Sequence, residues 1–303
     1  MHFLVFQTVP LLPPAAHRYL MGLGISAALF LASPPLPCVA AESVSTDGSS
    51  LTNPARSTDI VTPNIIVRGT SLARASAIRG RAERLRCDAF VKLLGENNPP
   101  PWIVNCEIHV HPTATSFGEA VGSFPADARG ATSLEFVGES VVSRRIDLLG
   151  DGSDVIPDAL AHELVHVVLA DHFKHFSPPR WADEGLALLF DKTDKQRGHA
   201  DDLRRALTLG VAWSASDLLT LKDYPEGSQR QRVFYGQSAA LVRWLIARKD
   251  TRTFIEFIDD AAAVGLPASL ERHYQLDSIA SIHSAWKEVA PIHMLQFADH
   301  SNF

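Results

Sequence analysis

The chain has 303 residues, 46% of them hydrophobic and 20% charged, with a formal net charge of −6. This composition indicates one or two globular domains with a substantial apolar core. The acidic balance excludes nucleic acid as the expected partner, because binding to phosphates requires a basic surface.

The N-terminal segment has the pattern of a signal peptide. Arg18 precedes an uncharged apolar run at residues 19–32, prolines follow the run, and small residues flank a cleavage site after Ala41. We therefore expect residues 1–41 to direct export to the periplasm or the medium, with no stable membrane span after cleavage. The alternative is an uncleaved membrane anchor, although a spanning helix needs about 20 apolar residues and this run is shorter.

Cleavage after Ala41 would remove Cys38 and leave Cys87 and Cys106 in the exported chain. Oxidising compartments allow disulfides to form and persist, so these two cysteines predict a bridge. Two free, buried thiols are the alternative.

Residues 42 to about 63 are rich in Ser, Thr, Asp and Gly and contain few large apolar side chains. This composition predicts a disordered linker, which we extend over residues 42–69. Residues 70–94 then have apolar side chains at helical spacing and predict a long helix that ends at Gly95.

Residues 102–110 alternate between apolar and polar side chains, which is typical of a strand. His109 and His111 share one face of this predicted strand. Two imidazoles on one face are compatible with a second metal site. We favour a polar outer face, because no third ligand is nearby in the sequence.

Residues 112–131 contain several glycines and prolines, a composition that predicts a loop or a hairpin. Two strands follow, at residues 131–137 and 141–148. A helix then begins near Pro157, which suits a first helical position, and carries the sequence H-E-L-V-H at residues 162–166.

A further helix begins at Arg180, and from about residue 200 the whole pattern is helical. The candidate helices there are 201–209, 215–221, 229–248, 251–264, 267–274 and 278–289. This order of elements predicts an α+β fold, with a small mixed sheet and the H-E-L-V-H helix followed by an all-helical C-terminal part. We place the first part at residues 70–198 and the second at residues 199–303.

The sequence H-E-L-V-H matches the H-E-x-x-H pattern of zinc sites. On a helix, His162 and His166 lie one turn apart on the same face and can direct two imidazoles at one point. Zn²⁺ accepts this geometry, with nitrogen ligands at roughly 2.0–2.1 Å. Glu163 can reach a water on the metal without binding the metal, as a general base requires. A buried helix with two satisfied histidines is the alternative interpretation.

A catalytic zinc usually has three protein ligands, so the pattern requires one more. Glu184 and His172 are the candidates. His172 has the spacing of the third histidine of the metzincins, but Leu169 stands where that family's pattern has a glycine. Without a sharp turn there, His172 lies about 240° round the helix from His166 and points away from it. This geometry argues against His172 as the third ligand.

The H-E-L-V-H sequence and the segment W-A-D-E-G-L-A at residues 181–187 together resemble the gluzincin metallopeptidases, in particular the bacterial peptidase MA-like proteins. The resemblance extends over about residues 70–290 and is most specific at residues 155–250. It implies a gluzincin-like fold, a zinc-binding subdomain at residues 70–198, and Glu184 as the third zinc ligand.

The same resemblance extends to F-Y-G-Q-S-A-A-L-V-R-W-L at residues 234–245. Related gluzincins use a tyrosine or a histidine in this part of the chain to donate a hydrogen bond to the developing oxyanion, which makes Tyr235 a candidate. A packed or surface tyrosine is the alternative. Asp183 and Asp171 are candidates for orienting a zinc histidine.

These residues predict an exported zinc metallopeptidase with a peptide or protein substrate. Zinc would polarise the scissile carbonyl and activate a water, and Glu163 would take the proton of that water. A strand near residues 134–137 or 141–148 would align an extended substrate at the sheet edge. The alternative is a catalytically inactive, zinc-stabilised binding or scaffolding protein on a peptidase fold.

Overall fold

The computed structural model describes residues 4–8, 60–61, 64–122, 128–150, 152, 155–174 and 176–282. The fold is α+β, as predicted. The strands of its mixed sheet are β1 (Leu4–Thr8), β2 (Ile60–Val61), β3 (Ile65–Arg68), β4 (Cys106–His111), β5 (Gly130–Val137) and β6 (Ser140–Leu149). Their spatial order is β1-β5-β6-β4-β3-β2, so the four central strands are flanked by the short β1 and β2.

The central strands combine one hairpin with parallel pairs. β5 and β6 are antiparallel and connect through a turn at Gly138, whose φ of +60° suits glycine. β6 pairs with β4 in parallel, and β4 pairs with β3 in parallel. β1 lies parallel to β5, on the side of β5 away from β6.

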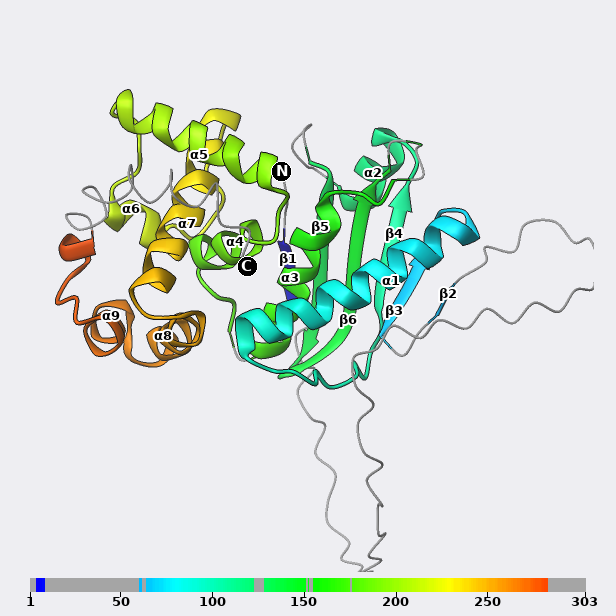
Figure 1. Cartoon of the computed structure of the whole chain (residues 1–303), viewed down its shortest axis with the longest axis horizontal. Helices are drawn as coiled ribbons and strands as arrows, with labels where there is room; N and C mark the ends of the chain where they lie inside the picture. The colour runs from blue at the N-terminus through cyan, green and yellow to red at the C-terminus, as the bar shows by residue number, and fades with distance from the viewer. Residues whose placement is uncertain are drawn as a thin grey trace, which may run out of the picture.

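The helices of the described chain are α1 (Leu72–Ala89), the π-helical η1 (Phe90–Leu94), α2 (Ala114–Val121), α3 (Ala159–His172), α4 (Arg180–Leu188), α5 (Thr193–Thr208), α6 (Ala215–Thr220), α7 (Ser228–Arg248), α8 (Thr251–Val264) and α9 (Leu266–Tyr274). Figure 1 shows α1 and α3 lying across one face of the sheet, with α4 to α9 grouped beside them.

The apolar core lies between the sheet and α1 and α3, and it continues into the helical part. On β4, Cys106, Ile108 and Val110 are buried towards this core, while the alternate residues lie on the other face. α7 is buried along most of its length, because α4, α5 and α8 pack around it. The predicted subdomain boundary at residues 198/199 falls inside α5, and one core includes residues from both sides of it.

The bounds of several elements differ from the predicted ones. β3 belongs to the sheet although residues 65–68 lie in the predicted linker. The sequence did not predict this strand, because four residues are too few to give a clear alternation. The predicted loop at 112–131 contains α2, whose Thr113 forms a capping box with Ser116. α3 begins at Ala159, after Pro157, and most of the predicted helix at 278–289 lies outside the described residues.

The predicted Cys87–Cys106 bridge is also wrong, because Cys106 is a free thiol. Cys106 is fully buried at the start of β4, and burial raises the pKa of its thiol. α1 turns Leu85 and Ala89 towards the sheet and leaves Cys87 on a partly exposed side.

The predicted signal peptide stays a prediction. β1 lies within it, whereas its apolar run at residues 19–32 falls outside the described residues. Within the part of the chain that the structure describes, no helix is both long and apolar enough to cross a membrane.

Candidate metal centre

α3 brings the two motif histidines together at the centre of the molecule. Apolar residues such as Leu164, Val165 and Val168 bury α3 against the sheet and the neighbouring helices. His162 and His166 lie one turn apart, with ring centroids 4.9 Å from each other, and both are fully buried. The helix therefore presents two imidazoles at one place, as the sequence predicted.

α4 brings the third side chain of the cluster. The Nε2 atom of His162 lies 3.2 Å from Oε2 of Glu184, and Nε2 of His166 lies 4.0 Å from Oε1 of the same carboxylate. Among the described residues, this is the group of His, Cys, Asp and Glu side chains that could hold a metal ion, with one atom from each residue lying within 4.8 Å of the others.

Close packing of α4 on α7 sets the position of Glu184. The next residue is Gly185, at which a Cβ atom would overlap Val242 and would lie 2.7 Å from the backbone oxygen of Ser238. Glycine thus lets α4 approach α7 at this point. This approach explains why glycine follows the glutamate in the W-A-D-E-G-L-A segment.

A carboxylate lies beside the outer nitrogen of each imidazole. Nδ1 of His166 lies 3.0 Å from Oδ1 of Asp183, and Nδ1 of His162 lies 3.4 Å from Oδ2 of Asp191. Asp191 also pairs with Lys195 at 2.8 Å. A partner on Nδ1 fixes the ring orientation and favours the tautomer with a lone pair on Nε2, which is the arrangement of histidine ligands in metal sites.

Burial and neighbouring charges strongly perturb these groups. Burial opposes protonation of His166, but Asp183, together with Glu184 and Glu163, raises the pKa of His166 to about 9. Burial alone would raise the pKa of Glu184, yet the two histidines and Tyr224 lower it below its ordinary value. Strong perturbation of several buried groups at one place is typical of a functional site.

The residues fit a zinc ion by their own chemistry. Two imidazole nitrogens and one carboxylate are the ligand types of a catalytic zinc site, in which a fourth position stays open. Nε2 of His166 is buried and has no hydrogen-bond partner among the described residues, so a polar atom aimed into the cluster is left unsatisfied. A cation bound between His162, His166 and Glu184 would satisfy it.

Glu163 lies beside the cluster and outside the ligand set. It is fully buried, and its Oε2 accepts a hydrogen bond of 2.7 Å from Oγ1 of Thr132 on β5. Burial raises the pKa of Glu163, although the neighbouring histidines and Thr132 oppose that effect. A buried carboxylate with a raised pKa suits a general base.

The tyrosine that contacts the cluster is Tyr224, which the sequence analysis did not identify. Its hydroxyl donates a hydrogen bond to Oε1 of Glu184. Tyr235 is buried on α7 and its ring packs against His199 and Phe234. Tyr224 precedes Pro225 in the loop before α7, and no motif distinguishes it from an ordinary loop tyrosine.

His172 is not part of the cluster. Its Nε2 lies 2.9 Å from Asp259 on α8, at the surface, which agrees with the expectation that it points away from His166. Asp171 does not orient a histidine either, since its carboxylate pairs with Arg144 of β6. Asp183 is therefore the one of the two candidate aspartates that contacts a motif histidine.

The polar face of β4 carries paired side chains. His109 pairs with Glu107 at 3.1 Å, and Nε2 of His111 lies 2.6 Å from Oδ1 of Asp147. Neither histidine belongs to the potential metal cluster of the described chain. The interpretation as a polar outer face thus agrees with the structure.

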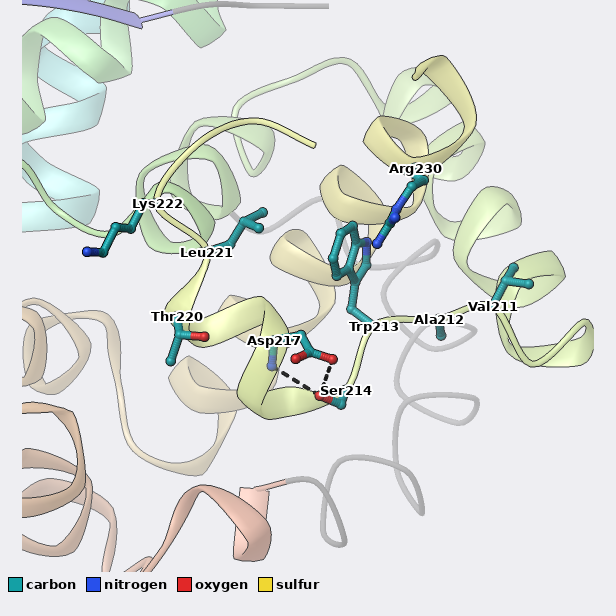
Figure 2. Close-up of a pocket in the computed structure, with 9 residues that line it drawn as sticks. All are labelled: Val211, Ala212, Trp213, Ser214, Asp217, Thr220, Leu221, Lys222 and Arg230. Atoms are coloured by element: carbon teal, nitrogen blue, oxygen red, sulfur yellow. Dashed lines mark hydrogen bonds between the residues drawn. The ribbon is translucent and has the colours of Figure 1, made fainter. Parts of the chain in front are cut away.

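A pocket of about 550 Å³ lies apart from the metal cluster, between α6 and the start of α7. Figure 2 shows the guanidinium of Arg230 over the ring of Trp213, and Ser214 hydrogen-bonded to Asp217 at the start of α6. Lys222 extends away from Trp213 and Arg230. The side chains that line it include none of the metal-binding candidates.

The fold and the cluster define an α+β protein with a buried His-His-Glu site of metal-ligand geometry. A scan against protein-family models finds no match to the chain, and neither does a search of curated proteins. The likeness to the gluzincins therefore depends on the motif residues themselves.

Proposed function

We propose that this protein is an exported zinc metallopeptidase that hydrolyses peptide bonds. The observation that carries the proposal is the convergence of His162, His166 and Glu184 within 4.8 Å, beside a buried Glu163 that is outside the ligand set. A purely structural zinc site has no need of such a carboxylate. The two motifs that carry these four residues resemble those of the gluzincin peptidases.

The ligand set would hold zinc through Nε2 of each histidine and the carboxylate of Glu184. Bound zinc would supply a Lewis acid for the scissile carbonyl and for the attacking water. Asp183 would keep the imidazole of His166 in the orientation that binding requires, Asp191 would support His162 from 3.4 Å, and Tyr224 would hold the carboxylate of Glu184.

Glu163 would perform the proton transfers. Its carboxylate would accept a proton from the attacking water and would then give that proton to the nitrogen of the leaving amine. Burial suits this cycle, because it raises the pKa of the carboxyl towards the range in which it can both accept and return a proton.

The substrate would lie along β5. β6 is paired on both sides, by β5 and β4, so the suggestion that residues 141–148 form the accepting edge is wrong. β5 carries Thr132, which contacts Glu163, and its outer side pairs with β1 from the predicted signal peptide. Removal of that segment would leave the edge of β5 available to an extended peptide.

The decisive experiment compares the wild type with Glu163→Gln on a broad peptide library, each with and without a chelator. We expect metal-dependent cleavage by the wild type, and loss of cleavage with retention of zinc in the variant. Cleavage by the variant at the wild-type rate would contradict the role of Glu163. A wild type that binds zinc and cleaves no peptide would favour the scaffolding alternative.

Zinc content also tests the ligand set directly. Glu184→Ala should remove bound zinc, whereas His172→Ala, which alters a surface pair with Asp259 and a ring contact with Phe173, should leave it unchanged. Loss of zinc from His172→Ala, with zinc retained by Glu184→Ala, would establish His172 as a ligand.

A further inference from the structure

β5 contacts the proposed base through one buried hydroxyl. Thr132 is fully buried, and its Oγ1 lies 2.7 Å from Oε2 and 3.1 Å from the backbone oxygen of Glu163. The hydroxyl proton can therefore be donated to the side chain or to the backbone of the same residue. This contact links the sheet to Glu163, which lies between the two motif histidines in the sequence.

A second residue of β5 fits around the same carboxylate. A Cβ atom at Gly130 would lie 2.7 Å from Oε1 of Glu163 and 2.8 Å from the Cβ of Ala159. Gly130 and Thr132 are two residues apart and so point to the same face of the strand, towards α3. Gly130 leaves space for the carboxylate of Glu163, and Thr132 donates a hydrogen bond to it.

The arrangement restricts where Glu163 can go. A glutamate side chain on a helix has several rotamers, and the motif alone does not select one of them. Thr132 favours the rotamer that places Oε2 against β5, and the absence of a side chain at Gly130 makes that rotamer sterically possible. Holding a catalytic group in its productive geometry accounts for a large part of catalysis.

We propose that Thr132 is a positioning residue for the general base Glu163, and that Gly130 is required to accommodate that base. The proposal rests on the proposed peptidase function. It concerns residues outside both motifs, and it assigns to β5 a role in orienting the base in addition to any contact with substrate.

The test uses the exported form of the protein with Thr132→Val and Thr132→Ser. Valine keeps the shape of threonine but removes the hydroxyl, and serine keeps the hydroxyl. Thr208→Val is the matched control, because it makes the same change at an exposed position of α5, where the hydroxyl bonds the backbone oxygen of Arg204. For each variant, kcat, KM and bound zinc are measured on one peptide that the wild type cleaves.

We expect Thr132→Val to lower kcat about tenfold or more, since hydrogen bonds to charged groups are worth more than neutral ones. KM and zinc content should change by less than about twofold, because neither the substrate contacts nor the ligands are altered. Thr132→Ser should recover most of kcat, and Thr208→Val should match the wild type.

A second measurement tests the contact without using activity. Denaturation midpoints of the zinc-free chain are compared for Thr132→Val, Glu163→Leu and the double variant. Residues that share a buried hydrogen bond should give non-additive shifts, and additive shifts would overturn the contact.

The outcomes separate the two proposals. Cleavage by the wild type, together with wild-type kcat in Thr132→Val, would overturn the positioning role and leave the peptidase function standing. Absence of metal-dependent cleavage by the wild type would overturn the peptidase function and with it the catalytic role of Thr132. Loss of zinc in Thr132→Val would also overturn the proposal, because it would show an effect on the ligands.

Discussion

Nδ1 of His166 lies 3.0 Å from Oδ1 of Asp183, the residue that directly precedes Glu184 on α4. Two adjacent residues of one helix thus serve the same site, one as a candidate ligand and the other as the partner of another ligand. A displacement of α4 would therefore disturb Glu184 and His166 together.

The Asp183 contact gives the first prediction. Asp183→Asn removes the negative charge that fixes the ring of His166 and should weaken zinc binding by about 10–100-fold. Competition with a chelating dye measures the affinity. Asp194→Asn is the control, because that side chain is 95% exposed on α5. Equal affinities for Asp183→Asn and the control would refute the prediction.

Tyr224 and Tyr235 are expected to give different phenotypes. Tyr224→Phe removes the hydrogen bond to Glu184 and should lower zinc affinity several-fold. If Tyr235 supports the oxyanion, Tyr235→Phe should lower kcat without changing zinc affinity. Dye competition and steady-state kinetics on both variants distinguish the two roles. A fall in zinc affinity with Tyr235→Phe alone would reverse the assignment.

Gly185 should not tolerate a side chain. Gly185→Ala places a methyl group against Val242 and the backbone of Ser238, so it should destabilise the fold by about 1–3 kcal/mol and weaken zinc binding. Gly198→Ala is the matched control on α5, where a Cβ meets no atom within 4 Å. This control should be neutral or stabilising by up to about 1 kcal/mol. Denaturant midpoints of the zinc-free chains would show the difference, and similar midpoints would contradict the packing argument.

His199 should make stability depend on pH. Burial, with a further contribution from Lys195, lowers its pKa from 6.5 to about 4, and both of its ring nitrogens are buried without a hydrogen-bond partner in the described structure. The unfolded chain binds a proton at His199 more readily than the folded chain. The contribution of neutral His199 to the free energy of unfolding is therefore complete above about pH 6.5 and is lost as the pH falls towards 4. His199→Phe keeps a ring against Tyr235 and removes the titration.

The measurement is the free energy of unfolding of the zinc-free wild type and His199→Phe between pH 7.5 and about 4. We expect the wild type to lose stability relative to the variant across that window. A constant difference between the two chains would show that His199 does not titrate on unfolding.

Local patterns were sufficient to predict part of this site. The one-turn spacing of His162 and His166 is a property of any α-helix, so their proximity follows once α3 is identified. The orientation of His172 away from the motif follows from the same geometry, and the structure agrees with it. The α+β order was also predictable, because the hydrophobic period changes along the chain from strand-like to helical.

The remaining features depend on contacts between segments far apart in the sequence. Thr132 reaches Glu163 because β5 lies under α3, and Tyr224 reaches Glu184 because the loop before α7 folds over α4. Cys106 is free because β4 buries it while α1 leaves Cys87 on another side. Periodicity reports which face of an element is apolar, but it does not report which other element covers that face.

The sequence by itself therefore determined the residue types of the candidate metal site and the elements that carry them, since both depend on short-range backbone geometry. Only the tertiary structure decided which distant hydroxyls and carboxylates surround those ligands. Their positions are set by the packing of α3 on β5 and of α4 on α7, and such packing is a property of the whole core.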